Sequence, residues 1–125
     1  MAYSISVVRE KQMLLLVFDG RHDPAQGMAG CQEAAAVCER ENIHLVLVDI
    51  RGIDPIPMTM NQIYSIQSSL PDIFSKSCRI AVVYNPALWP KTDTVFAENV
   101  CCNRGLQLRS FPTLPAAEQW LLTEN

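Results

Sequence analysis

Three short polar segments hold most of the side chains in this chain that could bind or react with another molecule. They cover residues 19–23, 49–58 and 85–91, and each follows an apolar stretch of strand length. The candidate ligand or partner residues in and beside them are His22, Asp49, Arg51, Asp54, Met58, Thr59, Trp89 and Lys91. This mixture suits a small polar or anionic group held beside an aromatic wall. Ordinary turn chemistry, in which Asp or Asn stands beside Pro, is the simpler explanation of the same loops.

No set of residues in the sequence forms a recognisable catalytic or metal centre. His22 lies close to Asp19 and Asp23, but a loop and a helix cap explain these two carboxylates. His44 falls inside a strand pattern, where a hydrogen-bonded structural role is expected. There is no glycine-rich phosphate loop, and no nucleophile can be paired with a base. We therefore predict no bound metal, no cofactor and no catalytic residue. An enzymatic function is expected only if Asp49, Arg51 and His22 converge in a deep pocket.

The five cysteines form an odd set without the paired spacing of a zinc site or a redox motif. Reduced and mostly buried thiols in a cytoplasm fit this pattern best. Cys101 and Cys102 are adjacent, and one of them could be a thiolate, but no neighbouring cation or paired cysteine is evident. We expect both of them to serve packing.

Composition limits the classes of function further. The 125 residues suffice for one hydrophobic core, and 49% of them are apolar while 18% are charged, so a single domain that folds alone is expected. A formal net charge of −3, with no basic stripe, makes nucleic acid an improbable partner. The apolar stretches are far shorter than a membrane span, and the first residues lack the pattern of a secretion signal.

The elements that must position the three polar segments can be placed from hydrophobic periodicity. An antiparallel hairpin is expected over 5–18, with a polar turn at 10–12. Asp23 and Pro24 then begin a helix, which Asn42 ends. Its apolar stripe is predicted to consist of small side chains at 25, 28, 31, 35 and 38, which would let the helix lie close to a sheet.

The second half of the chain alternates strands and helices. Residues 43–50 are almost continuously apolar, which indicates a central parallel strand covered on both faces, and a loop over 51–58 follows. Thr59 and Gln62 form a capping box for a second helix, which Pro71 interrupts. A strand over 78–84 comes next. The remaining predicted elements are a third helix capped by Thr92 or Asp93 and ended by Gly105, a strand over 106–110, and a helix after Thr113.

The resulting fold class is α/β: a single mixed, mostly parallel sheet of about five strands in ββαβαβαβα order. Right-handed crossovers are expected to place helices on both faces. Because ligands in open α/β sheets sit beyond the carboxyl ends of the strands, the three polar segments should open on one edge. The apolar residues and prolines of 53–60, with Ala-Leu-Trp-Pro at 87–90, favour a rigid apolar patch there. Alternatively, Leu88 and Trp89 only cap the core.

Three stretches of sequence carry a resemblance to a known family. They are Val-Asp at 48–49, Arg-Ile-Ala-Val-Val at 79–83, and Arg-Ser-Phe at 109–111 followed by Ala-Ala-Glu-Gln-Trp-Leu at 116–121. Together with the element order, they resemble the STAS and SpoIIAA-like families, which comprise sulfate-transporter and anti-sigma-antagonist domains and small standalone relatives. The likeness covers nearly the whole chain and is closest to the small SpoIIAA-like proteins. It implies one SpoIIAA-like domain over 1–125.

One departure from that family concerns regulation. Anti-sigma antagonists present a phosphorylatable serine at the start of the helix after the central strand, usually within Asp-Ser-Ser-Gly. This chain has Pro-Met-Thr-Met at 57–60, so Met58 occupies the place of the acceptor serine. The hydroxyl of Thr59 is explained by its role as a helix cap. We therefore expect no phosphorylation switch of the sporulation type.

Two kinds of function follow from these observations. The first is a non-catalytic protein-interaction or regulatory module of the STAS/SpoIIAA-like type, acting on a protein partner or by self-association as a homodimer. The alternative is the binding of a small apolar or amphiphilic, lipid-like ligand under the loop that contains Trp89. The shape of the loop edge separates them, because a cavity favours a small ligand and a flat surface favours a protein.

Overall fold

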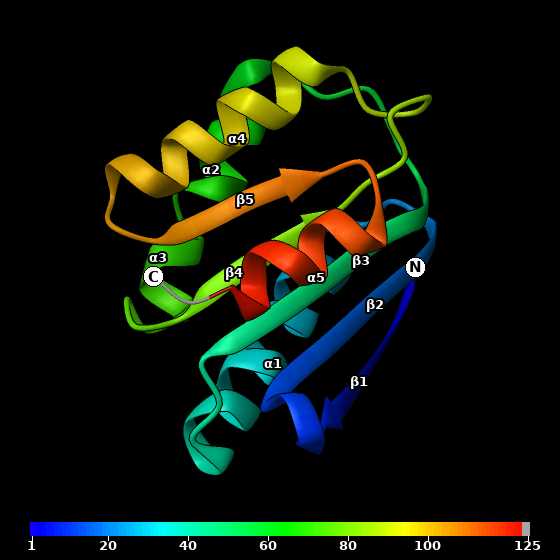
Figure 1. Cartoon of the computed structure of the whole chain (residues 1–125). Coiled ribbons are helices and arrows are strands. Elements are labelled where there is room, and N and C mark those ends of the chain that lie inside the picture. The colour runs from blue at the N-terminus through cyan, green and yellow to red at the C-terminus, as the bar shows by residue number, and fades with distance from the viewer. Residues whose placement is uncertain (124–125) are drawn as a thin grey trace.

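A five-stranded mixed sheet forms the centre of the protein (Figure 1). The computed structural model describes residues 1–123 of the chain. The strands are β1 (Ala2–Val8), β2 (Met13–Arg21), β3 (Leu45–Asp54), β4 (Arg79–Val83) and β5 (Gln107–Phe111). The helices are α1 (Pro24–Glu41), α2 (Met60–Gln67), α3 (Leu70–Ile73), α4 (Lys91–Asn103) and α5 (Leu114–Leu122), with a 3-10 turn η1 (Arg9–Lys11) in the first hairpin. The predicted element order and fold class are confirmed.

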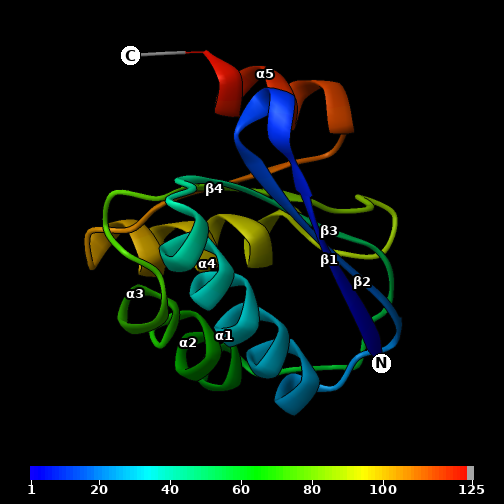
Figure 2. The same ribbon diagram turned by 90° about the horizontal axis from the view of Figure 1, so that it is seen from below.

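The strands lie in the sheet in the order β1-β2-β3-β4-β5. β1 pairs with β2 in antiparallel fashion, and all the other neighbours are parallel. This order explains the layers in Figure 2, where α1 to α4 cover one face of the sheet and α5 covers the other. When strands are added in one direction by crossovers of a single hand, every crossover helix lands on the same face. Helices on both faces are therefore confirmed, but the second face is covered by α5 and not by a crossover helix.

β3 lies at the centre of the sheet and is longer than its apolar run. It continues to Asp54, so the predicted loop over 51–58 is wrong for 51–54. β2 extends in parallel with it, after an irregularity between Val17 and Asp19, and pairs as far as Arg21. A Cβ atom on Gly52 would lie only 2.8 Å from the Cβ of Asp19. The missing side chain at Gly52 thus lets the two strands stay together beyond the irregularity.

The helix boundaries follow the capping residues in most cases. Asp23 caps α1, Thr59 forms the predicted capping box with Gln62, and Thr113 caps α5. The prediction that Thr92 or Asp93 caps α4 is wrong, because the helix already begins at Lys91 with Pro90 at the cap position. Proline fixes its own φ at −61° there and leads the chain directly into the first turn.

The left-handed residues that end two helices are where the sequence placed them. Asn42 has a φ of 58° at the end of α1, and Gly105 has a φ of 93° after α4. The buried stripe of α1 consists of small residues as predicted, but it runs through Gly30, Ala34 and Cys38, and Ala25 is exposed. His44 has the expected structural role, since its ring nitrogens lie 2.9 Å from Ser77 Oγ and 3.2 Å from Asn42 Oδ1.

The hydrophobic core has two parts, one on each face of the sheet. Leu14, Leu16, Val46, Val48 and Ile80 belong to the larger part, which packs against α1, α3 and α4. Leu47, Ala81 and Val83 belong to the smaller part beneath α5. Neighbouring residues of β3 thus enter different parts, which confirms that this strand is covered on both faces. The larger part is also the one that contains the candidate site.

Candidate functional site

An apolar cavity of about 520 Å³ lies at the carboxyl end of the parallel strands, between the sheet and α1, α2 and α4. This volume is within the range of about 300–1,000 Å³ that is usual for small-molecule sites. All three loops that follow the parallel strands β2, β3 and β4 contribute to the wall, through His22, Met58 and Trp89 among others. Leu88 also lines the cavity and is 45% exposed, so it does more than cover the core.

The sequence builds this cavity from small residues on the helices and rigid turns at the rim. Gly27 and Cys31 of α1 and Ala97 of α4 face it, and none of them has a side chain that would fill the space. The rim segment 55–58 contains two prolines, which restrict the backbone without adding long side chains. Short side chains on α1 and α4 therefore leave space at this edge of the sheet.

The rings of His22 and Trp89 form the polar corner of the cavity wall. They stand edge to face, with centres 6.2 Å apart and planes at 88°. The Nδ1 atom of His22 and the Nε1 atom of Trp89 are both buried, and within residues 1–123 neither has a hydrogen-bond partner. The His22 backbone is fixed, since its N–H donates to the Asp54 carbonyl over 2.9 Å.

Burial lowers the pKa of His22 below the ordinary value of 6.5, although the charge of Asp23 acts in the opposite direction. The imidazole is therefore neutral at neutral pH. Asp93 is the carboxylate of the described cavity wall, and no lysine or arginine side chain lines it there. The thiol of Cys31 also faces the cavity, and burial raises its pKa to about 12, so it stays protonated.

Asp49 and Arg51 do not reach the cavity, although the sequence grouped them with His22 and Trp89. Val48 and Ile50 line the cavity, and side chains alternate along a strand, so Asp49 and Arg51 point to the opposite face of the sheet. Arg51 donates to both carboxylate oxygens of Asp49, over 3.0 and 2.8 Å. Burial raises the pKa of Asp49, but the hydrogen bonds and charge of Arg51 outweigh it and leave that pKa below 3.8.

The other three predicted site residues also lie outside the cavity wall. The Oγ1 atom of Thr59 accepts the N–H of Gln62 over 3.1 Å and begins α2. Asp54 contributes its backbone carbonyl to the hydrogen bond with His22. Lys91 opens α4 and lines a separate shallow groove with Met60, Thr92, Val95, Phe96 and Asn99.

Several residues of the cavity wall could not be recognised as site residues in the sequence. Ile63, Ile66 and Leu70 were identifiable as the buried face of the second helix, but not as the wall of an open space. Met28 of α1 and Gln67 of α2 also line the cavity. The only signal in the sequence was the unusual number of small residues on α1, which predicted close packing and not a cavity.

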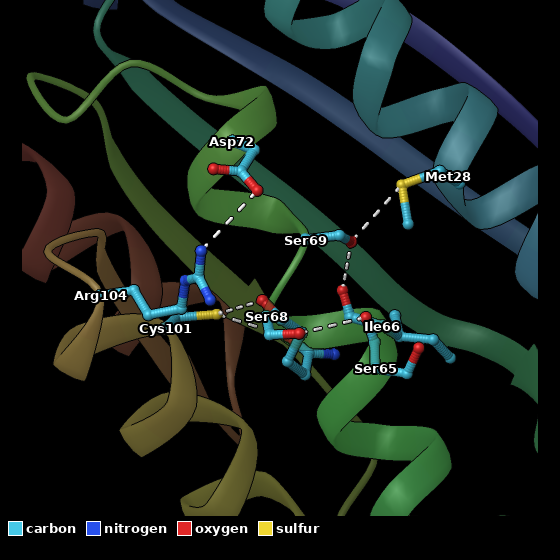
Figure 3. A network of polar contacts seen from close by, with 9 residues as sticks. Met28, Ser65, Ile66, Ser68, Ser69, Asp72, Cys101 and Arg104 are labelled. Carbon is cyan, nitrogen blue, oxygen red and sulfur yellow. Dashed lines mark hydrogen bonds and ion pairs between the residues drawn. The ribbon is translucent and has the colours of Figure 1, made fainter.

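A network of weak polar contacts holds α2 and α3 in place over the cavity (Figure 3). The hydroxyl of Ser69 lies 2.6 Å from the Ile66 carbonyl and 3.8 Å from the sulfur of Met28 on α1. The thiol of Cys101 on α4 lies 3.5 Å from the Gln67 carbonyl. Burial raises the pKa of Cys101 to about 12, which agrees with its predicted packing role. The predicted packing role is wrong for the adjacent Cys102, because that residue is exposed.

Comparisons with known proteins support the fold and leave the function open. Neither the protein-family models nor the curated proteins contain a match for this sequence. Among solved structures, an anti-sigma factor antagonist from Mycobacterium paratuberculosis is similar, with a TM-score of 0.58 over 96% of this chain and 94% of that chain. The two sequences are 12% identical. This confirms the predicted STAS/SpoIIAA-like fold. Within residues 1–123, no helix has the length and apolar character needed to cross a membrane.

Proposed function

We propose that this protein is a non-catalytic binding module of the STAS/SpoIIAA-like type that takes up a small apolar or amphiphilic molecule. The cavity of about 520 Å³ at the carboxyl edge of the sheet carries this proposal. A flat surface would favour a protein partner, whereas the apolar side chains here line a cavity with an open rim. The binding energy comes from the removal of apolar ligand surface from water.

The groups that line the cavity support binding and not a reaction. The Cys31 thiol is held protonated by burial, as described above, so it is a poor nucleophile. The hydroxyl of Thr94 donates to the Lys91 carbonyl over 2.9 Å and is thereby occupied. His22 is neutral, and its Nδ1 atom has no partner among residues 1–123 that would orient it as a base.

A pair of variants on α4 tests this proposal. Ala97 lines the cavity, while Asn99 on the same helix is exposed and outside it. We expect the uncharged dye Nile red to bind the wild-type protein saturably, with one molecule per chain. Ala97→Phe should fill part of the space and abolish this binding, and Asn99→Phe should leave it unchanged. Absence of saturable binding to the wild type, or equal effects of the two variants, would contradict the proposal.

A second candidate function is contact with a protein, and the outer faces of α2 and α4 favour it. Met60 and Tyr64 on α2 are 48% and 50% exposed, and Val95 on α4 is 42% exposed. Met60 and Val95 share the shallow groove that contains Lys91. The similar solved structure is described as an anti-sigma factor antagonist. By analogy with that description, this surface is proposed to contact a partner protein or a second copy of the chain.

Self-association through this surface can be tested directly. Sedimentation of the wild type over a range of concentrations should show a dimer that Val95→Asp removes. Asn103→Asp introduces the same charge at an exposed position of α4 outside this groove and should leave the dimer intact. A monomer at every concentration would exclude the homodimer and leave only a different protein as the partner.

We also propose that the module is not switched by phosphorylation and that it acts in the cytoplasm. Met58 occupies the place of the family's acceptor serine, and the Thr59 hydroxyl is engaged in the capping box. All five cysteines are free, which suits a reducing compartment. Incubation with cytoplasmic kinase extracts should leave Thr59 unmodified, as judged by mass spectrometry.

A further inference from the structure

The charges around the cavity restrict the ligands that can enter it. Among the described lining residues, the carboxylic acid is Asp93, and no lysine or arginine side chain is present to neutralise an anion. Met1 also lines the cavity, and its side-chain methyl carbon lies 3.7 Å from the Cβ position of the lining residue Gly27. Its amino nitrogen instead lies beside the exposed Gly20, 3.9 Å from the Cβ position there, and Gly20 is not a lining residue. An ionised carboxylate or phosphate would lose its water here without gaining a cationic partner. The wall therefore disfavours fatty-acid anions and phospholipid head groups.

The polar atoms of the wall indicate which group the ligand must carry. The indole Nε1–H of Trp89 can only donate a hydrogen bond, so it requires an acceptor. It is buried and has no partner among residues 1–123, and the same holds for Nδ1 of the neighbouring His22. The two ring centres are 6.2 Å apart, so both rings belong to one corner of the wall. An oxygen-containing group in that corner would satisfy the unpaired donor when the indole ring turns its buried N–H towards the cavity on ligand entry.

The direction of the cavity gives the position of the apolar part. The corner with His22 and Trp89 lies at the loop edge, whereas the opposite end is formed by the buried side chains of Leu70 and Phe74. Between these ends, Ile63 and Ile66 of α2 line the cavity with hydrocarbon side chains. A ligand with its polar group at the rim and its hydrocarbon beneath α2 matches both ends.

We propose that the ligand is an uncharged, mainly hydrocarbon molecule with a carbonyl oxygen near one end, as in a ketone, an aldehyde or an ester. Its oxygen accepts the hydrogen bond of Trp89, and its chain extends beneath α2 towards Leu70 and Phe74. This inference rests on the proposed binding function and adds the chemical class of the ligand.

A matched pair of probes tests the class of ligand. Methyl octanoate and octanoate have the same acyl chain, but only octanoate is charged at pH 7.5. In isothermal titration calorimetry, we expect methyl octanoate to bind at least about tenfold more tightly than octanoate, because only the anion loses hydration without a cationic partner. Equal or tighter binding of octanoate would overturn the proposal about ligand class, while leaving the binding function intact.

Two tryptophan variants test the hydrogen bond itself. Trp89→Phe retains an aromatic wall without the N–H donor, and we expect it to weaken methyl octanoate binding about three- to tenfold. Trp120→Phe is the matched control, because Trp120 packs on the other face of the sheet with Phe111. Circular dichroism establishes that both variants are folded. Unchanged binding in Trp89→Phe, or an equal loss in both variants, would overturn the role of the indole.

Nile red binding distinguishes a failure of the proposed binding function from a failure of the proposed ligand class. If the wild type binds neither Nile red nor methyl octanoate, the proposed binding function itself is contradicted. If Nile red binds saturably but the ester does not, the cavity accepts apolar molecules and the proposal of a carbonyl-bearing chain is refuted.

Discussion

The close contact of α1 with the sheet can be tested by a single methyl group. A Cβ atom added at Gly30 would lie 2.7 Å from Cζ and 2.8 Å from Cε1 of Phe18, and 3.2 Å from Cγ of Tyr3. Gly27 lies on the same helix one turn earlier, and its added Cβ would meet only the methyl carbon of Met1, at 3.7 Å. Gly30→Ala and Gly27→Ala thus make the same chemical change in a crowded and in an open place.

The expected magnitudes follow from two opposing effects. Replacing glycine by alanine inside a helix stabilises it by about 1 kcal/mol. At Gly30, the Phe18 ring must also move by about 0.8 Å to restore an ordinary contact of about 3.5 Å, and such overpacking costs about 1–3 kcal/mol. We therefore expect Gly30→Ala to lower the free energy of unfolding by about 1 kcal/mol and Gly27→Ala to raise it by about 1 kcal/mol.

Urea unfolding followed by circular dichroism measures both free energies, and thermal unfolding provides a second readout. A difference of about 2 kcal/mol corresponds to melting temperatures about 8 °C apart for a domain of this size. Because Phe18 also lines the cavity, the displaced ring in Gly30→Ala should weaken methyl octanoate binding relative to the wild type. Equal stability of the two variants would show that α1 does not lie as close to β2 as the structure places it.

Three further predictions concern single side chains. Thr59→Ala removes the capping box of α2 and should lower the free energy of unfolding by about 1 kcal/mol, measured in urea. Asp49→Asn breaks a partly exposed ion pair and should cost about 0.2–1 kcal/mol at pH 7. Since the folded pKa of Asp49 is below 3.8, this difference should be complete above pH 3.8 and vanish as pH falls further, which acid titration of both proteins would reveal. The folded pKa of His22 is below 6.5, so wild-type stability should decline as pH drops below 6.5, and His22→Gln should lose this dependence in urea unfolding at pH 5 and 8.

The secondary structure was predictable wherever short-range chemistry decides it. Asp23 with Pro24 begins α1, and Asn42 ends it, because capping groups and a left-handed residue act within one turn of the chain. The start of α4 was predicted wrongly, because Pro90 stands at its cap position. A proline at the cap position fixes the backbone without a capping side chain, so the hydroxyl of Thr92 and the carboxylate of Asp93 were misleading signals.

The candidate site was only partly predictable for a different reason. The apolar run that ends at Ile50 gave no indication that β3 continues to Asp54, because the continuation depends on pairing with β2 across the missing side chain of Gly52. Within the longer strand, alternation sends Asp49 and Arg51 to the face opposite the cavity. Their type and spacing suggested ligand binding, whereas in the fold they pair with each other.

The sequence by itself determined the order of the elements, the caps of α1, α2 and α5, the central position of β3 and the meeting of three loops at one edge of the sheet. These features depend on residue periodicity and on the fact that parallel strands end on the same side. Only the tertiary structure decided that a cavity of about 520 Å³ opens there, with His22 and Trp89 in one corner. The distance between helices and sheet depends on how all their side chains pack together, and periodicity shows which face is buried but not how much space remains beneath it.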